Sequence, residues 1–302
     1  MAALGVLSPL AARLAEPSQR LTLAELADAW VISEVEARVP MMGVLAGDVG
    51  VLAKVRGAWG RALMDGASAE AIVGQPCPFE PPCALDVFFR EQVRVQRAGL
   101  PKPYLFEADR DGNDLIVRLR IFGLATEWTP VAADRLVQAL NTGLPWLALA
   151  RMPNLKPPKV AQVRVQTHHG VELGPVPGSA TIHLLTPFED EDQRMEEAPW
   201  SFLRRASFRL SGLARWHDAE LEADWRAQEA VWRGLDYDLT RLRQDAVDRA
   251  SRGRAFRQES VVGEIGISGD LAALWPMLEI ASLCGAGRGA AHGLGRFALY
   301  AA

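Results

Sequence analysis

The sequence predicts an α+β protein built from two tandem βαββαβ domains, the ferredoxin-like (RRM-like) arrangement. The chain has 302 residues, about twice the length of a common single domain. Its first half follows the order strand, helix, strand, strand, helix, strand. A second series of strands and helices begins after residues 168–178, which are rich in glycine and proline. We therefore expect domains at residues 1–170 and 171–302.

The first strand and the first helix are predicted from a change in hydrophobic period. Residues 30–39 alternate apolar and polar side chains, as in a half-buried strand. Over residues 51–64 the apolar positions follow a helical period, and Leu52 belongs to their stripe. Lys54 and Arg61, seven residues apart, share a polar flank of this helix.

The first half continues with two strands, a second helix and a last strand, predicted at residues 104–108, 115–122, 129–141 and 160–165. The turn at residues 109–113 joins the two strands as a hairpin because it contains Asp-Gly between alternating apolar runs. Thr129 is the expected N-cap of the second helix, with Pro130 in its first turn.

The second half repeats the pattern with one long insertion. In order, we expect strand 180–185, helix 200–216, a highly charged and largely helical insertion at 221–252, strand 261–267, helix 271–283, a glycine-rich loop at 285–295 and strand 296–301. The second strand of this domain is not evident in the pattern, and residues 237–239 are the candidate for it.

Composition and charge exclude several classes of protein. Apolar residues make up 49% of the chain and charged residues 23%, which is typical of a folded protein and not of a disordered one. The formal net charge is −4, so nucleic-acid binding requires a local basic patch. No uncharged run is long enough to cross a bilayer, and the first residues lack a signal-peptide pattern. We expect a cytoplasmic protein without a membrane partner.

The cysteines and histidines indicate no cofactor and no metal site. Three cysteines are too few for a disulfide framework and favour a reducing compartment. Cys77 and Cys83 have no second pair to complete a tetrahedral site. Ser-His-Asp and HExxH patterns are not evident in the sequence.

The strongest local signal is the run GAGRGAAHGLGR at residues 285–296. Five glycines in eleven residues leave backbone N–H groups open to an anion, and arginine and histidine side chains add donors. A flexible turn is the alternative interpretation. The RNA-binding candidates in this loop are Gly285, Gly287, Arg288, Gly289, Gly293, Gly295 and Arg296.

A second basic feature lies on the predicted helix at residues 200–216. Arg204, Phe208 and Arg215 share the face opposite its apolar stripe. An aromatic ring between two guanidiniums suits stacking on a base together with phosphate contact. The alternative is that Phe208 packs beneath the charged insertion.

The C-terminal run LAALWPMLEIASLCGAGRGAAHGLGRFAL resembles the signature of the CRISPR repeat-processing endoribonucleases of the RAMP superfamily. In that family, an apolar helix, a glycine-rich loop and a last strand form an RNA-binding edge of the second ferredoxin-like domain. Further segments agree with the family in order: VRGAWGRAL, QPCPFEPPC, GLPKPYLFE, ATIHLLTPF and FLRRASFRLSGLARWHD. The resemblance spans the chain from about residue 30 to its end.

The resemblance implies cleavage of precursor crRNA without a metal and retention of the 3′ repeat stem. The RNA 2′-hydroxyl attacks the adjacent phosphate, leaving a 2′,3′-cyclic phosphate and a 5′-hydroxyl. The family's usual catalytic histidine lies in or near the first helix, whereas residues 1–167 contain no histidine. Members without it rely on Lys/Arg clusters or on tyrosine, or have weak or lost cleavage. The partner that the resemblance implies is CRISPR repeat RNA, with other effector-complex subunits as further partners.

The catalytic candidates follow from this departure. His292 replaces the usual aromatic residue of the loop, and an imidazole with an unperturbed pKa of about 6.5 suits acid–base work. Stacking on a base is the alternative role of His292. His217 is the second imidazole candidate, while Lys54, Arg56 and Arg61 can stabilise the phosphorane. Two other functions stay open: a non-cleaving crRNA-binding subunit, and a metabolic ferredoxin-like enzyme.

Overall fold

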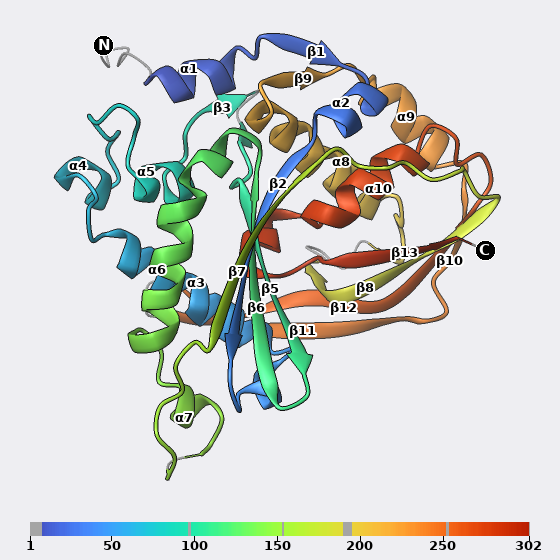
Figure 1. Ribbon diagram of the computed structural model, residues 1–302. Helices are drawn as coiled ribbons and strands as arrows, with labels where there is room; N and C mark the ends of the chain where they lie inside the picture. Colours follow the sequence, from blue (N-terminus) through green and yellow to red (C-terminus); the bar gives the residue numbers. More distant parts are fainter. Residues whose placement is uncertain (1–7, 96–97, 153, 190–194, 252–253, 302) are drawn as a thin grey trace.

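The computed structural model describes residues 8–95, 98–152, 154–189, 195–251 and 254–301 (Figure 1). Up to residue 169 the elements are α1 (Pro9–Ala15), β1 (Gln19–Leu21), α2 (Leu23–Ala29), β2 (Val31–Val39), η1 (Gly43–Leu45), α3 (Val49–Leu63), α4 (Ala69–Ile72), α5 (Ala84–Phe89), β3 (Arg94–Val95), β4 (Ala98–Gly99), β5 (Tyr104–Asp111), β6 (Asp114–Phe122), η2 (Gly123–Trp128), α6 (Thr129–Thr142), α7 (Trp146–Leu149) and β7 (Gln162–His169). They are followed by β8 (Ser179–Glu189), α8 (Ser201–Trp216), β9 (Ala219–Leu221), α9 (Trp225–Trp232), β10 (Asp236–Asp238), β11 (Leu242–Ser251), β12 (Arg254–Ser268), α10 (Trp275–Cys284), η4 (Arg288–His292) and β13 (Phe297–Ala301).

The first sheet has the antiparallel strand order β5-β6-β2-β7. The first and third strands of the unit therefore lie in the centre, as the ferredoxin-like topology requires. Helices α3 and α6 lie together beside this sheet (Figure 1). Trp59 of α3 is fully buried, and its indole N–H donates to the Ala132 carbonyl of α6 at 3.0 Å. This bond satisfies a buried polar atom and ties the two helices together.

The second sheet repeats the same order, with β10-β12-β8-β13 and with β11 also paired to β12. Helices α8 and α10 pack against each other and supply the apolar layer of this half. The predicted fold class, two tandem ferredoxin-like domains, is confirmed.

The expectation of a largely helical insertion at residues 221–252 is wrong. Among the described residues of this range, only those of α9 form a helix, and β10 and β11 supply the strand that the sequence pattern did not show. β11 pairs residue by residue with β12 from Leu242–Gly263 to Ser251–Arg254. Its ten residues LRQDAVDRAS have no clear apolar alternation, so pairing with β12 decides their conformation. The predicted strand at 237–239 is found at Asp236–Asp238.

Smaller differences concern the ends of elements. Thr129 is the first helical residue of α6 and not its N-cap, and Trp128 occupies the cap without a side-chain bond. The strand predicted at 160–165 lies at Gln162–His169, and α10 starts at Trp275 instead of residue 271. A hydrophobic pattern predicts the presence of a helix or strand better than it predicts the residues at which that element begins and ends.

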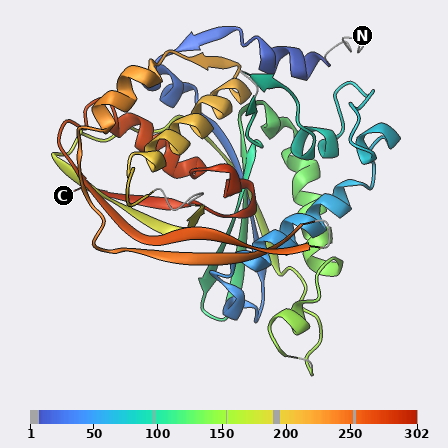
Figure 2. The same ribbon diagram turned by 180° about the vertical axis from the view of Figure 1, so that it is seen from behind.

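The N-terminal segment packs on the second half of the chain. β1 pairs in parallel with β9, while α1 contacts α8 and α2 contacts α10 (Figure 1). Seen from behind, the long β11–β12 hairpin reaches in the other direction to α3 (Figure 2). The two halves are therefore interlocked at both ends, and the boundary at residue 170 stays a prediction.

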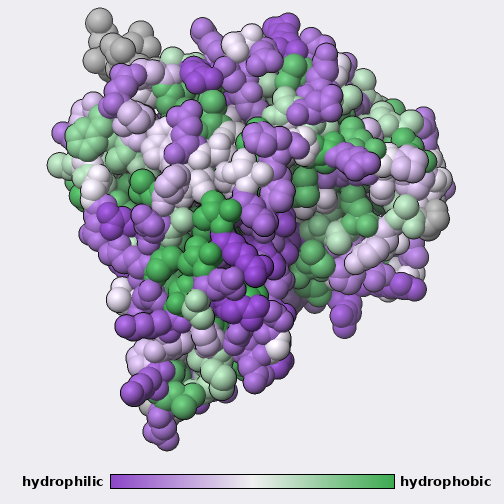
Figure 3. Space-filling view, in the orientation of Figure 1, coloured by the Kyte–Doolittle hydropathy of each residue, from purple (hydrophilic) through white to green (hydrophobic). Residues whose placement is uncertain are grey.

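Hydrophilic side chains cover most of the face seen in Figure 3, with hydrophobic patches between them. Within the described ranges, each helix is too short or too polar to cross a bilayer. In the same ranges, His, Cys, Asp and Glu side chains nowhere gather in threes that could hold a metal ion.

Candidate nucleic-acid interface

The glycine-rich loop is a compact structure closed by its own backbone. Gly285 ends α10 at φ +72°, and the Ala286 N–H donates to the Gly295 carbonyl at 2.8 Å. Gly295 in turn donates to the Pro187 carbonyl at 2.9 Å, at a φ of +66°. A Cβ on Gly295 would lie 2.1 Å from the Ala286 carbonyl oxygen, so only glycine fits there.

Most of the loop amides that we expected to face an anion are used within the protein. The backbone N–H groups of residues 285, 286 and 293–296 donate to acceptors in or beside the loop. The expectation of open amides is therefore corrected, and at most the tip at residues 287–292 can offer them. Arg288 lies at this tip with an exposed side chain.

The loop tip packs on the first half of the chain. η4 contacts α3, β5 and β8. A Cβ on Gly293 would lie 2.4 Å from Leu52 Cδ1 and 3.2 Å from the Phe106 carbonyl oxygen. The absence of a side chain at Gly293 thus lets the loop meet α3 and β5, and it places the half-buried His292 at the junction of the two halves.

The three basic candidates of α3 have different surroundings. Lys54 is exposed. The Arg56 guanidinium donates to the Tyr104 hydroxyl at 2.8 Å and lies 4.7 Å from the centre of the Phe89 ring, a cation–π contact. Arg61, in the last turn of α3, donates to the Gly143 carbonyl at 3.3 Å. Arg56 follows Leu52, against which the glycine loop packs, by four residues and so shares its face of α3, whereas Lys54, two residues after Leu52, lies on a different face.

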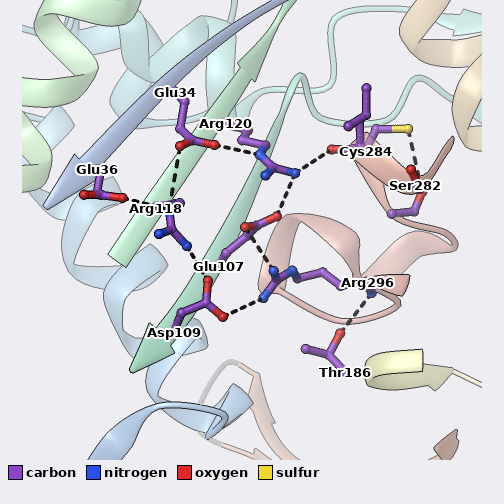
Figure 4. Close-up of polar contacts among 12 residues, drawn as sticks. Glu34, Glu36, Glu107, Asp109, Arg118, Arg120, Thr186, Ser282, Cys284 and Arg296 are labelled. Carbon is purple, nitrogen blue, oxygen red and sulfur yellow. Dashed lines mark hydrogen bonds and ion pairs between the residues drawn. The ribbon is translucent and has the colours of Figure 1, made fainter. Parts of the chain in front are cut away.

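Arg296 is held in an ion-pair network between the halves (Figure 4). Its guanidinium lies 3.0 Å from a carboxylate oxygen of Glu107 and 3.8 Å from one of Asp109. Glu107 is buried and also pairs with Arg120 of β6 at 3.0 Å. The Arg296 side chain therefore joins the loop to the first sheet, which disfavours its predicted role in RNA contact.

The sequence pattern missed two arginines that cap a buried helix end. Arg209 of α8 donates to the Cys284 carbonyl at 2.6 Å, and Arg120 donates to the Leu283 carbonyl at 3.3 Å. These carbonyls end α10, where positive charge is favourable. Arg209 is buried on the face of α8 that packs against α10, and burial lowers its pKa. Its burial could have been predicted from the sequence, because Arg209 follows Ala206, a residue of the apolar stripe of this helix, by three positions.

His217 is used in the structure and is not free for catalysis. Its Nε2 accepts the Val31 N–H at 3.0 Å, and its Nδ1 lies 2.9 Å from the Leu213 carbonyl. The ring stacks on Trp30 with centroids 4.1 Å apart. Burial lowers the pKa of His217, so the neutral tautomer with a proton on Nδ1 fits these partners. This geometry disfavours its predicted catalytic role.

The predicted basic face of α8 lines a groove whose opposite wall includes residues 221–232 of the insertion, and the insertion does not cover Phe208. Phe208 is 53% exposed, and Arg204 is also exposed. Arg215 is held by the carbonyls of Leu14 and Ala15, at 3.1 and 2.7 Å. The face thus provides one exposed aromatic ring and one exposed cation.

A half-buried lysine near Arg56 is a further residue that the sequence pattern did not show. Lys102 donates to the carbonyls of Phe89 and Arg90, each at 2.7 Å. Burial, with the nearby Arg56 charge, lowers the pKa of Lys102 to about 8. Its position in the segment GLPKPYLFE was the available signal.

Two tandem ferredoxin-like domains with a glycine-rich loop before the last strand are the arrangement that the resemblance to the RAMP superfamily implies. A solved structure described as "Cas6 (TTHB231) product complex" has the same fold, with a TM-score of 0.52 and 14% identity over 89% of this chain and 99% of that one. Another, described as "Cas6 (TTHA0078) product complex", has a TM-score of 0.47 and 15% identity over 90% of this chain and all of that one.

Residues 180–297 match the family model described as CRISPR-associated endoribonuclease Cas6. The match contains the glycine loop and α8, and it confirms the resemblance to the CRISPR repeat-processing endoribonucleases. No curated protein sequence matches the chain.

Proposed function

We propose that the protein is an endoribonuclease that cleaves precursor crRNA within the repeat without a metal and retains the 3′ repeat stem. The observation that carries this proposal is the contact of Gly293 with Leu52 and Phe106, which sets the glycine loop against α3. The match of residues 180–297 to the Cas6 model supports it. The proposal sets His292 and the α3 cations Lys54 and Arg56 around one RNA phosphate at this junction.

The chemistry requires four things of this junction. A base removes the proton of the 2′-hydroxyl, the 2′-oxygen bonds to phosphorus as the bond from phosphorus to the 5′-oxygen breaks, and an acid protonates the departing oxygen. In-line placement and cations stabilise the phosphorane. We assign acid–base work to His292 and charge stabilisation to Lys54 and Arg56. Arginine cannot serve as the base because its pKa exceeds about 12. The exposed Arg288 of the loop tip is the candidate for holding an RNA phosphate.

The reaction is tested with end-labelled repeat RNA in EDTA. We expect cleavage in the chelator, a 5′-hydroxyl on the downstream fragment and a 2′,3′-cyclic phosphate on the upstream one. Cleavage that appears only when a divalent cation is added would contradict the proposed mechanism.

The role of His292 is tested by comparing His292→Ala with His292→Phe in single-turnover cleavage. We expect both variants to slow cleavage by about 100-fold or more while RNA affinity is retained, because loss of a general acid or base costs about 10²–10⁴. Recovery of the wild-type rate by His292→Phe would assign the residue to base stacking and leave catalysis to the basic residues of α3.

One observation favours a second function, a non-cleaving crRNA-binding subunit. Residues 1–167 contain no histidine, so α3 lacks the imidazole that family members use there. A gel shift of repeat RNA without cleavage, under conditions where the RNA is bound completely, would favour this alternative. Contacts with other subunits of an effector complex belong to both functions.

A further inference from the structure

A groove of about 590 Å³ lies over the outer face of α8, on the side of the helix that does not pack on α10. Its volume is in the range of sites that hold small molecules. It is enclosed by the strand β4 and the loop after it, by β9 and by α9. The side chains that line it and enter the argument are Arg204, Phe208, Arg215, Glu220, Trp225 and Arg226.

The groove offers aromatic surface to a ligand. Phe208 is 53% exposed, which is unusual for a large apolar side chain within a concave site. Trp225 is half-buried on the opposite wall, and its ring centroid lies 6.1 Å from that of the buried Trp232. Gly212 keeps the groove closed at one side, because a Cβ there would lie 2.2 Å from Pro101 Cδ.

The charges of the groove favour an anion. Both carboxylates on its walls have cationic partners: Glu229 pairs with Arg233 at 2.6 Å, and Glu220 lies 3.6 Å from Arg215. The guanidiniums of Arg204 and Arg226, in contrast, make no ion pair or hydrogen bond with the described part of the chain. Two uncompensated cations beside an exposed ring match a planar base that carries a phosphate.

We propose that this groove binds one unpaired nucleotide, whose base stacks on Phe208 and whose phosphate lies between Arg204 and Arg226. The choice of RNA as the source of the nucleotide rests on the proposed function. A free mononucleotide has the same chemistry. The groove is formed by the outer face of α8, whereas the cleavage site is assigned to the junction of η4 with α3, so the two sites can be tested separately.

The first experiment measures binding of a short fluorescein-labelled oligouridylate by fluorescence anisotropy. We expect Phe208→Ala to weaken binding about tenfold, as loss of a stacking partner does, and Arg226→Ala to lower the salt slope by about 0.7. The matched control is Phe79→Ala, because Phe79 is also 53% exposed but lies outside the groove. Competition by UMP identifies the free nucleotide as a ligand, and its failure to compete identifies single-stranded RNA.

A second experiment locates the bound strand. Oligouridylate with a central 4-thiouridine is irradiated on the wild-type protein, and we expect cross-links in the tryptic peptides of residues 206–209, with Phe208, and of residues 216–226, with Trp225. Cross-links confined to the glycine loop, or equal affinities for Phe208→Ala and Phe79→Ala, would overturn the proposal and leave the groove to a protein partner. Repeat cleavage by Phe208→Ala reports on the proposed function independently, since Phe208 does not belong to the cleavage site.

Discussion

The imidazole of His217 shows how a residue of catalytic type can serve packing. It stacks on Trp30 and joins the end of α8 to the start of β2 through Val31. A protonated ring could not accept the Val31 N–H, and burial also disfavours the charged form. Because the pKa of His217 is lowered on folding, the unfolded chain binds more protons than the folded one below about pH 6.5.

We therefore predict that the stability contributed by His217 is present above about pH 6.5 and is lost as the pH falls below it. In urea, the free energy of unfolding should be higher for the wild type than for His217→Gln at pH 7.5. This difference should be smaller at pH 5. His169→Gln is the matched control, because His169 is exposed at the end of β7 and should leave the pH dependence unchanged. A gap between wild type and His217→Gln that widens in acid would contradict the assigned tautomer.

At the scale of elements, the glycine loop depends on one position without a side chain. Gly293 combines a φ of +84° with a close approach to Leu52 and to the Phe106 carbonyl. Gly74 has nearly the same φ, +83°, but open space around its Cβ position. Comparing substitutions at these two glycines separates the loss of stability caused by backbone strain from the loss caused by disturbing the contact between the loop and α3.

We predict that Gly293→Ala lowers stability by about 2–3 kcal/mol and abolishes repeat cleavage, because strain and displacement of the loop add together. Gly74→Ala should lower stability by about 1 kcal/mol and leave cleavage intact. Thermal unfolding and single-turnover cleavage of the two variants check this. Equal behaviour of both variants would show that the loop does not need its contact with α3.

At the scale of the whole molecule, the halves are held together by a buried carboxylate. Glu107 of the first sheet faces Arg120 of its own sheet and Arg296 of the glycine loop, each at 3.0 Å (Figure 4). A cavity of about 450 Å³ lies beside this network, lined also by Glu172 and by α10. Removing Glu107 takes away a partner at 3.0 Å from both arginines, which then keep only Glu34 and Asp109 as carboxylate partners.

We predict that Glu107→Ala costs about 3 kcal/mol of stability, because it leaves Arg120 and Arg296 without their shared partner. Glu172→Ala is the control: Glu172 lines the same cavity but is exposed, so its loss should cost less than about 0.5 kcal/mol. Denaturant unfolding measures both. A cost for Glu107→Ala no greater than that of the control would show that the network does not hold the halves together.

The sequence by itself determined the elements with a clear hydrophobic period and the loop with a high glycine content. The stripe of α3, the alternation of β6 and the glycines after α10 were evident because each follows from neighbouring residues. The resemblance to a family followed from the same local segments. Only the tertiary structure decided that β11 is a strand and that β1 pairs with β9, because those segments obtain their hydrogen bonds from distant partners. The tertiary structure also decided the surroundings of the charged groups: Arg296 pairs with Glu107, whereas Arg204 lies in a groove. Ion pairing and burial depend on contacts between residues far apart in the chain, so neighbouring residues do not reveal them.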